Sequence, residues 1–584
     1  MRTRWPRQRS APSRTLERTR RLRRPLTTLG LAALILIAAR PLPLAAQAPS
    51  ARVPTVAAAQ APVQIANPAP APPPEQSPTT PPPPALMATG ELSSARGQPA
   101  TRAESDVLPA HIAARLPALT LDQSQISVYV RGVDNPIPRL AVNAETPRIP
   151  ASVTKLVTSI AALDMLGPDY RWHTDVYVTG PAVGGHLAGD LIIKGFGDPY
   201  LTTEAYEGLI RTIRAKGIEH IDGDLIFDSS QLLPPEAERG DFDGAGQRSY
   251  NALPAALSLN RQATVVHIYN DEQSGRVGVY TEPPLSTVQI VNEAKVVAAP
   301  CRGRYHRLSV SVSDPADTVP PRPTEPPTLK VSGSFASECP EERIRRLILS
   351  PEQQAAAAFD ALWRELGGSI QGRVRLGKVP RDAALFHRAE SQTLAEVLCA
   401  MNKYSDNLMA RMLFLTIGTE REAPPGAVEK SRDALFTWLA EKGFALPELV
   451  IDNGSGLSRE TRISAASLGE LLTFAYQQPW MPELIASLPI LGVDGTLATR
   501  MRKEPLEGRA HLKTGTVRNA SCIAGYVLDG NGKRWVVVVL VNAPEGQTLQ
   551  AWRGHALHHD LLRWVYDGAP LPAAEDEVPA TGIH

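Results

Sequence analysis

The 584-residue sequence contains little cysteine, little lysine and no excess of either charge. Four cysteines in a chain of this length exclude a disulfide-stapled miniprotein, and no Cys-x-x-Cys pair suggests a structural zinc site. Basic residues number 61 and acidic residues 60, a balance that excludes a globally basic nucleic-acid binder. The length itself predicts about three domains.

Arginine and proline are concentrated near the start of the chain. Residues 1–24 hold ten arginines and one acidic residue, and an apolar run from Leu26 to Ala39 follows. This order predicts a secretory signal peptide over residues 1–48 and hence a periplasmic protein. An uncleaved anchor is the alternative, but the run is shorter than the roughly 20 residues that span a bilayer.

Proline-rich and acidic segments bracket the part of the chain that we expect to fold. Residues 49–106 contain fourteen prolines and few large apolar side chains, which predicts a disordered tether, or a ligand for a proline-binding partner. Residues 569–584 are polar and acidic and are predicted to form a disordered tail. The folded part should therefore span about residues 107–568.

The first chemical signal in the folded part lies just after Pro150. Apolar residues recur there at spacings of three and four, which predicts a helix that ends at Gly167. Ser152 and Lys155 share one face of this helix. Such a serine can act as a nucleophile if burial lowers the pKa of the lysine. A solvated helix face is the alternative, but this is the only Ser-x-x-Lys in a chain with twelve lysines.

A second signal is the triplet Ser405-Asp406-Asn407. It lies between two helical patterns, so two rigid elements would present its side chains. An ordinary helix N-cap is the alternative, since serine and aspartate are preferred there.

A third signal, Lys513-Thr514-Gly515-Thr516, opens a β pattern. Strands are predicted at 523–528 and 535–541, joined by a turn at 529–532. The lysine and the threonine hydroxyls can hold a carboxylate, and a glycine in an edge strand permits close approach of a ligand backbone. The alternative is an ordinary strand start.

In this order and in these contexts, the three motifs resemble those of the β-lactamases and penicillin-binding proteins. Ser152 and Ser405 are 253 residues apart, which leaves room for a large insertion, as in the class C low-molecular-mass penicillin-binding proteins. These are the D-Ala-D-Ala carboxypeptidases of peptidase family S13. Further similar stretches lie at 189–199, 222–228, 250–260, 453–458 and 492–497, with Asn453 in place of the usual aspartate.

The resemblance implies an α/β (α+β) fold with a transpeptidase-like domain and two nested, β-rich inserted domains. The transpeptidase-like domain would combine residues 107–173 and 380–568 around a five-stranded antiparallel sheet flanked by helices. The outer inserted domain would cover 174–262 and 343–379, and the inner one 263–342. A C-terminal helix near 550–566 would pack on the main sheet.

The resemblance also implies acyl transfer to peptidoglycan stem peptides. Ser152 would be the nucleophile and Lys155 its base. Ser405 would pass a proton to the leaving amine, and Asn407 would position Lys155 and the substrate.

Lys513, with Thr514, Gly515 and Thr516, would bind the terminal carboxylate of the substrate. Backbone amides of Ser152 and Thr516 would form an oxyanion hole. Penicillins would acylate the same serine, and the resemblance implies no cofactor and no metal.

The resemblance further implies that an acidic residue of the inserted domain binds the amine end of the substrate side chain. Asp243 lies near the corresponding place, and Leu457 and Val517 would line the same pocket. An exported protein also favours a disulfide between Cys301 and Cys339. Cys399 and Cys522 are expected to be buried thiols, with a second bridge as the alternative.

Two other functions stay open at this point, a serine β-lactamase and a non-catalytic envelope protein that binds peptidoglycan. Also open are the balance of carboxypeptidase and endopeptidase activity, the preferred third stem residue, oligomeric state and any loose association with the inner membrane.

Overall fold

The computed structural model describes residues 103–233, 236–301, 306–313 and 326–571. The predicted signal peptide, nearly all of the tether and most of the predicted tail lie outside these residues. No helix within the described ranges is both long and apolar enough to cross a bilayer.

A five-stranded sheet organises the two ends of the described chain. Its strands follow the order β18-β19-β20-β1-β2, and every neighbouring pair is antiparallel. The strands are β1 (Ile126–Gly132), β2 (Leu140–Val142), β18 (Ala510–Val517), β19 (Ala520–Leu528) and β20 (Arg534–Asn542). The predicted sheet is confirmed, and β18, which carries the lysine-threonine-glycine motif, is an edge strand as expected.

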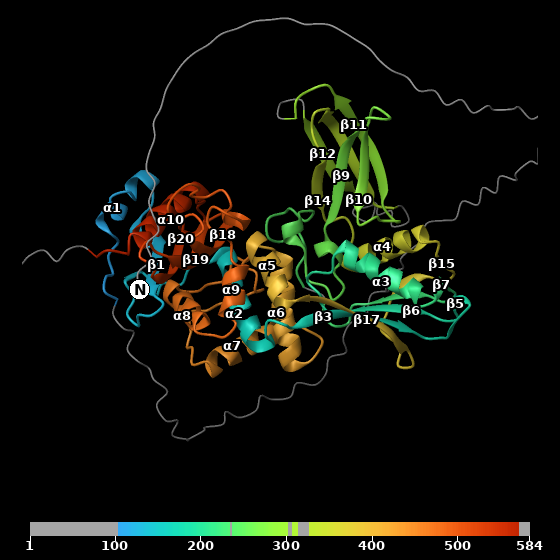
Figure 1. Cartoon of the computed structure of the whole chain (residues 1–584), viewed down its shortest axis with the longest axis horizontal. Helices are drawn as coiled ribbons and strands as arrows, with labels where there is room; N and C mark the ends of the chain where they lie inside the picture. The colour runs from blue at the N-terminus through green and yellow to red at the C-terminus, as the bar shows by residue number, and fades with distance from the viewer. Residues whose placement is uncertain (1–102, 234–235, 302–305, 314–325, 572–584) are drawn as a thin grey trace, which may run out of the picture. The chain divides into compact units, whose positions relative to one another are not determined.

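Each face of this sheet packs into its own hydrophobic core, because alternate residues of a strand point to opposite faces. Val538 of β20 belongs to the core that includes α2 (Lys155–Leu166) and α8 (Ala465–Tyr476). Its neighbour Val539 belongs to the core on the other face, with α1 (Ala110–Ala113) and α10 (Ala551–Tyr566). Figure 1 shows α8 and α10 on either side of the strands. The expected arrangement, with helices on both faces, is confirmed.

The other helices of this part are α5 (Leu394–Tyr404), α6 (Asn407–Glu422), α7 (Val428–Glu441) and α9 (Met481–Ser487). Short 3-10 turns lie at Pro117–Leu119, Gln123–Gln125, Ala151–Thr154, Ser249–Asn251, Leu259–Gln262 and Gly495–Leu497. A capping box starts α5, since Thr393 accepts from the Glu396 amide and Glu396 accepts from the Thr393 amide.

The segment between α2 and α5 forms two further sheets that share a core with two helices. One sheet has the order β16-β8-β6-β3-β17 and the other β15-β7-β5-β4. The strands are β3 (Arg171–Val178), β4 (Ala182–Val183), β5 (Gly185–Leu187), β6 (Leu191–Gly195), β7 (Ile218–Ile221), β8 (Leu225–Asp228), β15 (Ser369–Ile370), β16 (Val374–Leu376) and β17 (Ala384–Thr393). The helices are α3 (Thr203–Ala215) and α4 (Pro351–Glu365). Because β17 pairs along β3, this sheet continues past residue 379, the predicted end of the outer inserted domain.

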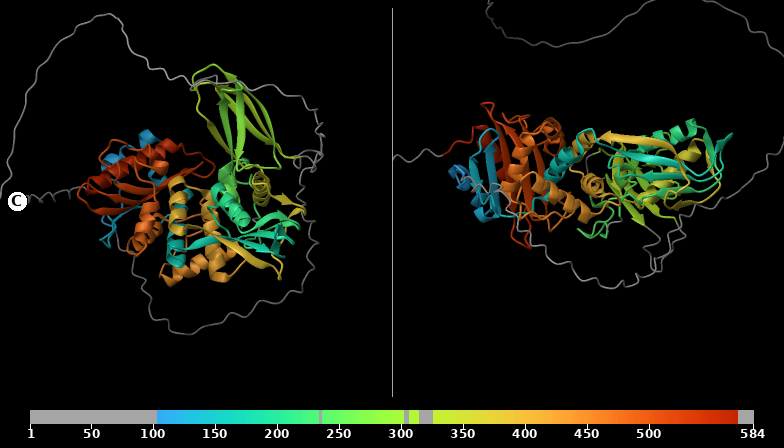
Figure 2. Two further views of the ribbon diagram at one scale, coloured as in Figure 1. Left: turned by 45° about the vertical axis from the view of Figure 1, so that its right-hand side comes forward. Right: turned by 90° about the horizontal axis from the view of Figure 1, so that it is seen from below.

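Within this segment, the described residues between 264 and 346 form a strand module, visible in green in Figures 1 and 2. One of its sheets has the order β10-β9-β14 and the other β11-β13-β12, around a common core. The strands are β9 (Thr264–Asp271), β10 (Arg276–Glu282), β11 (Gln289–Val297), β12 (Arg307–Ser313), β13 (Thr328–Ala336) and β14 (Glu342–Arg346).

A disulfide joins Cys301 and Cys339 in this module. The parallel strands β11 and β13 end at the register pair Val297 and Ala336, and the two cysteines follow shortly after those ends. The thiol of Cys399 is free and half-buried, whereas that of Cys522 is free and fully buried.

The C301A/C339A double variant should unfold more easily than the wild type. A bridge between residues 38 apart restricts the unfolded chain, and its loss should lower the free energy of unfolding by about 4 kcal/mol. Urea denaturation followed by circular dichroism measures this value. The C399A variant is the control and should cost about 1 kcal/mol or less. Equal stability of the double variant and the wild type would contradict the prediction.

Candidate active site

Ser152 lies on the 3-10 turn Ala151–Thr154, directly before α2. Its side chain is half-buried. Ala151, the residue before it, has a φ of 49°, which is unusual for a residue other than glycine. Gly456 packs against this turn, and a Cβ there would overlap the Ala151 carbonyl. The serine is therefore held on a tight, constrained turn rather than on a solvated helix face.

Lys155 is completely buried and has three oxygen atoms around its Nζ. Ser152 Oγ lies 3.2 Å away, Asn407 Oδ1 2.8 Å and the Ser455 carbonyl oxygen 2.7 Å. Two of these oxygens can only accept hydrogen bonds, whereas the serine hydroxyl can also donate. A neutral amine satisfies this set by donating two hydrogens and by accepting the proton of Ser152 with its lone pair.

Burial holds the pKa of Lys155 well below its usual range, and the nearby Lys513 ammonium lowers this pKa further. The Asp406 carboxylate acts in the opposite direction. A lysine that is neutral near pH 7 can accept a proton from a serine hydroxyl, which is what activation of a serine nucleophile requires.

Asn407 is buried and its amide has a fixed orientation. Its Nδ2 donates to the Tyr250 carbonyl at 3.1 Å, so its Oδ1 is turned toward Lys155. Asp406 accepts from the Met409 amide at 3.0 Å and caps α6. The triplet thus both caps a helix and supplies a side chain to the site.

The loop 453–458 lies beside Lys155, which donates to the Ser455 carbonyl. Asn453 Oδ1 accepts from the backbone amide of Ser455 at 3.1 Å and from its hydroxyl at 2.7 Å. These bonds point the Ser455 carbonyl at Lys155. The Gly454 carbonyl accepts from Thr158 of α2 at 2.7 Å, which ties the loop to the helix that carries the lysine.

Lys513, on the edge strand β18, is the second buried lysine of the site. Its Nζ donates to Ser405 Oγ at 2.9 Å and to the Thr514 carbonyl at 2.8 Å. Burial lowers the pKa of Lys513 to about 7. The structure therefore connects the lysine-threonine-glycine strand directly to the serine of the triplet.

Segment 492–497 contacts the chain on both sides of the hydrogen bond between Lys513 and Ser405. Asp494 forms an ion pair at 2.6 Å with Lys403, which lies two residues before Ser405. The hydroxyls of Thr496 and Thr514 lie 2.8 Å apart. One short segment therefore contacts both the helix that leads to the triplet and the edge strand.

Gly515 allows β18 to approach the nucleophile closely. A Cβ at this position would lie 2.6 Å from the Pro150 carbonyl oxygen and 2.8 Å from the Ser152 nitrogen. The next residue, Thr516, is exposed, so its side chain is accessible to a ligand. The backbone next to Thr516 thus runs beside the Ser152 amide, as an oxyanion hole made by these two residues requires.

The residues predicted to contact the substrate side chain lie at the edge of this hydrogen-bonded group. The Leu457 amide donates to Ser455 Oγ at 3.2 Å, and Asp243 contacts Tyr250. Asp243 and Val517 line a hollow of about 870 Å³, whereas Leu457 lines a neighbouring hollow of about 520 Å³. The Asp243 carboxylate accepts from Tyr250 OH at 2.7 Å and from Asn251 Nδ2 at 2.8 Å, and these bonds lower its pKa.

Four residues around the site have no role predicted from the sequence. Tyr250, Ser455 and Thr496 lie in the similar stretches 250–260, 453–458 and 492–497, whereas Arg459 lies outside them. Tyr250 and Ser455 act through backbone carbonyls, which any residue type provides. Arg459 lines both hollows. Within the described residues, no group of three or more histidine, cysteine, aspartate or glutamate side chains is arranged to hold a metal ion.

The G515A variant should lose acylation by penicillin about tenfold or more, because the added methyl group would push β18 away from Ser152. Stopped-flow labelling with a fluorescent penicillin measures the rate. The matched control is G208A on α3, where an added Cβ meets nothing within 4 Å. If G515A is acylated as fast as G208A, the close approach is not needed.

Comparison with known proteins shows the family of the chain. The model of the D-Ala-D-Ala carboxypeptidase 3 (S13) family matches residues 108–556. A D-alanyl-D-alanine carboxypeptidase of Actinomadura sp. (strain R39) is 32% identical over 406 residues, 66% of this chain and 72% of that protein. The D-alanyl-D-alanine carboxypeptidase DacB of Haemophilus influenzae is 25% identical over 402 residues, 68% of this chain and 81% of that protein.

A crystal structure of penicillin binding protein 4 from Haemophilus influenzae has the same fold. Its TM-score is 0.62 at 23% identity, and the match covers 77% of this chain and 99% of that one. The matched family model includes all three motifs and the residues between them. The chain therefore belongs to the D-Ala-D-Ala carboxypeptidase (S13) family of penicillin-binding proteins.

Proposed function

We propose that the chain is a serine-type D-Ala-D-Ala carboxypeptidase and D,D-endopeptidase that acts on peptidoglycan stem peptides through a Ser152 acyl-enzyme. The observation that carries this proposal is the buried Lys155 amine, whose remaining partner is the Ser152 hydroxyl at 3.2 Å. Family membership and the two relatives named as D-alanyl-D-alanine carboxypeptidases support the choice of substrate.

In the first half-reaction, Ser152 Oγ attacks the carbonyl carbon of the penultimate D-alanine while its proton passes to Lys155 Nζ. The carbonyl oxygen becomes an oxyanion that accepts from the amides of Ser152 and Thr516. The peptide bond then breaks. The leaving D-alanine amine takes up the proton that Lys155 accepted, relayed through the Ser405 hydroxyl, so that Lys155 is neutral again before deacylation. Lys513 Nζ donates to this hydroxyl at 2.9 Å and holds it in place.

In the second half-reaction, water attacks the acyl-enzyme ester and releases the shortened peptide. Lys155 takes a proton from the water and returns one to Ser152. A penicillin enters the same pathway at the first step. It leaves an acyl-enzyme that hydrolyses slowly, because its leaving group stays attached.

Recognition of the substrate is assigned to two regions. Lys513 and the hydroxyls of Thr514 and Thr516 bind the terminal carboxylate. Asp243 and Val517, with Leu457 nearby, receive the substrate side chain. The hollow that Asp243 lines carries acidic and basic side chains, which suits a side-chain end that bears both charges.

The protein is proposed to act in the periplasm after removal of residues 1–48. The Cys301–Cys339 disulfide supports an oxidising compartment. We also propose that the strands of residues 264–346 form the inner inserted domain. The surrounding segment from β3 to β17 then forms the outer one.

The S152A variant tests the proposal. It should lose both labelling by fluorescent penicillin and D-alanine release from a muropeptide pentapeptide, because no other group replaces the nucleophile. Persistent labelling of S152A would contradict it. Rapid turnover of penicillin by the wild type would favour the β-lactamase alternative, and labelling without D-alanine release would favour the non-catalytic one.

The pH dependence of kcat/KM should be bell-shaped for a pentapeptide with a free carboxylate. The rate rises with pH as Lys155 loses its proton, and it falls above about pH 7 as Lys513 loses the charge that binds the carboxylate. The same pentapeptide with a C-terminal amide is the control and should lack the fall at high pH. Identical profiles for both substrates would contradict the assignment of Lys513.

A further inference from the structure

A constrained stretch of backbone lies beside the Ser-Asp-Asn triplet. Asn260, Arg261 and Gln262 have φ values of 47°, 56° and 58°, so three successive residues other than glycine adopt the left-handed conformation. L-amino acids visit this conformation as single residues rather than in runs. Such strain persists only where surrounding contacts hold the chain, and it clusters at functional sites.

Hydrogen bonds hold this stretch at both ends. The backbone amide of Asn260 donates to the Leu201 carbonyl at 2.7 Å, and its Nδ2 donates to the Ala263 carbonyl at 3.1 Å. Gln262 is buried and donates to the Leu253 carbonyl. The middle residue, Arg261, is partly exposed.

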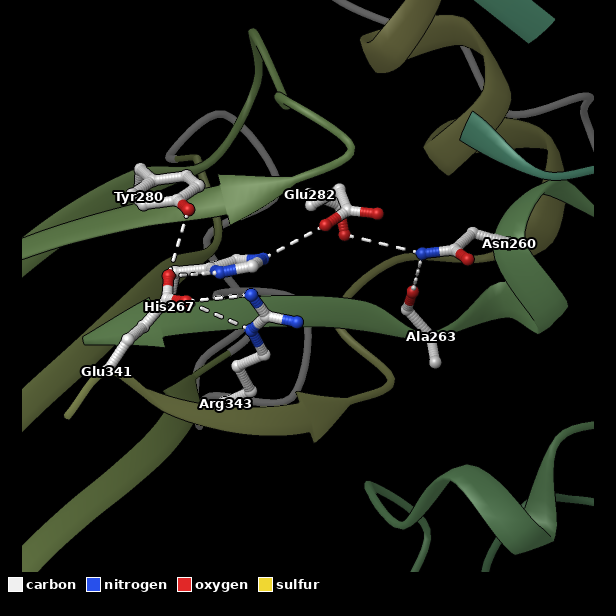
Figure 3. Close-up of polar contacts among 7 residues, drawn as sticks. All are labelled: Asn260, Ala263, His267, Tyr280, Glu282, Glu341 and Arg343. Carbon is white, nitrogen blue, oxygen red and sulfur yellow. Dashed lines mark hydrogen bonds and ion pairs between the residues drawn. The ribbon is translucent and has the colours of Figure 1, made fainter. Parts of the chain in front are cut away.

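A polar network in the strand module continues from Asn260 (Figure 3). Asn260 Nδ2 lies 3.5 Å from the Glu282 carbonyl oxygen, and the Glu282 carboxylate lies 3.0 Å from His267 Nε2. His267 Nδ1 lies 2.6 Å from Glu341 Oε1, and the Glu341 carboxylate also forms an ion pair with Arg343. The stretch is thereby attached to strands β9, β10 and β14.

Arg261 reaches the catalytic triplet. Its guanidinium lies 3.6 Å from Asp406 Oδ2, and both side chains are largely covered, with 30% and 19% exposed. The other oxygen of Asp406 caps α6 through the Met409 amide. The constrained stretch therefore places one positive charge against the charged residue between Ser405 and Asn407.

The charge on Asp406 matters for Lys155. Three charged groups act on Lys155: Lys513 and Arg411 favour its neutral form, whereas Asp406 favours the ammonium. A guanidinium paired with the Asp406 carboxylate reduces the field that this carboxylate exerts on Lys155.

We propose that Arg261 is a positioning residue: by pairing with Asp406 it fixes the Ser-Asp-Asn loop and keeps Lys155 in the neutral form that accepts the Ser152 proton. The inference rests on the proposed function, since it assumes that Lys155 is the base. It also gives the inserted segment a direct part in the chemistry, beyond substrate recognition.

The experiment is the pH dependence of acylation by a fluorescent penicillin, measured between about pH 5.5 and 9.5 for wild type, R261M and R261K. In R261M the unpaired carboxylate should raise the pKa of Lys155, so the rate should fall about three- to tenfold at the acidic end and approach the wild-type rate at the alkaline end. R261K keeps the charge and should stay within about twofold of wild type throughout.

Two controls separate this role from general stabilisation. R421M removes an exposed ion pair with Glu441 on α6 and α7, at 3.4 Å, and should leave the profile unchanged. In a D406N background, R261M should cause no further shift, because the carboxylate that Arg261 offsets is absent. If R261M does not fold, R261Q is measured in its place with the same expectations.

A loss of equal size at every pH would overturn the proposal, as would a loss that persists in the D406N background. Wild-type protein that is not acylated at all would instead refute the proposed function. The two failures are therefore distinguishable within the same data set.

Discussion

The amine of Lys155 is the constraint on which the rest of the site depends. A lysine with no solvent contact is stable only as a neutral group or with compensating charges, and here the acceptors around it are a carboxamide and a backbone carbonyl. Neither carries a negative charge. In the neutral form, the amine donates to these two acceptors and its lone pair can face Ser152 Oγ, 3.2 Å away. The packing that buries the lysine thereby also prepares the nucleophile.

Distant parts of the chain meet to make this environment. The triplet supplies Asn407, the loop 453–458 supplies the Ser455 carbonyl, and β18 closes the site through Lys513. The five-stranded sheet makes this possible, because it fixes β18 as an edge strand beside the turn that carries Ser152. Helices in cores on both faces of the sheet hold that edge in place.

Glycine residues and backbone carbonyls determine much of the local geometry of the site. Gly456 and Gly515 lie where a Cβ would collide with the turn around Ser152, so close approach requires their lack of a side chain. Carbonyls of Tyr250 and Ser455 orient Asn407 and Lys155. A change in the backbone path at Tyr250 or Ser455 would move these carbonyls away from Asn407 and Lys155.

The motifs and the main sheet could be predicted because their signals are local. Ser-x-x-Lys on an amphipathic helix, a polar triplet between helices, and alternating apolar strands are visible in short windows. The contacts made by the backbone carbonyls of Tyr250 and Ser455 could not be predicted from the sequence. They depend on tertiary packing, and every residue type has a backbone carbonyl. The ion pair of Arg261 with Asp406 joins residues 145 positions apart, so no short window of the sequence shows it. The strand β17 has only a weak alternation of apolar residues, so its bounds could not be predicted either.

The sequence does contain a signal for the start of helix α4, which was not predicted. Ser350, Pro351 and Gln353 form a helix start with a capping box, which would have placed α4 within the segment that we described as β-rich. Asp243 was assigned by resemblance alone. Its bonds to Tyr250 and Asn251 leave it exposed in the hollow but already paired.

The central claim is that Lys155 is neutral in the resting protein, and direct titration of its side chain tests this most closely. Protein labelled with 13C at lysine Cε would be followed by NMR, with the Lys155 signal assigned by its loss in K155R. We predict that the signal keeps the chemical shift of a neutral amine at pH 7 and titrates well below the usual lysine pKa. A signal that stays that of an ammonium up to about pH 10 would contradict the account.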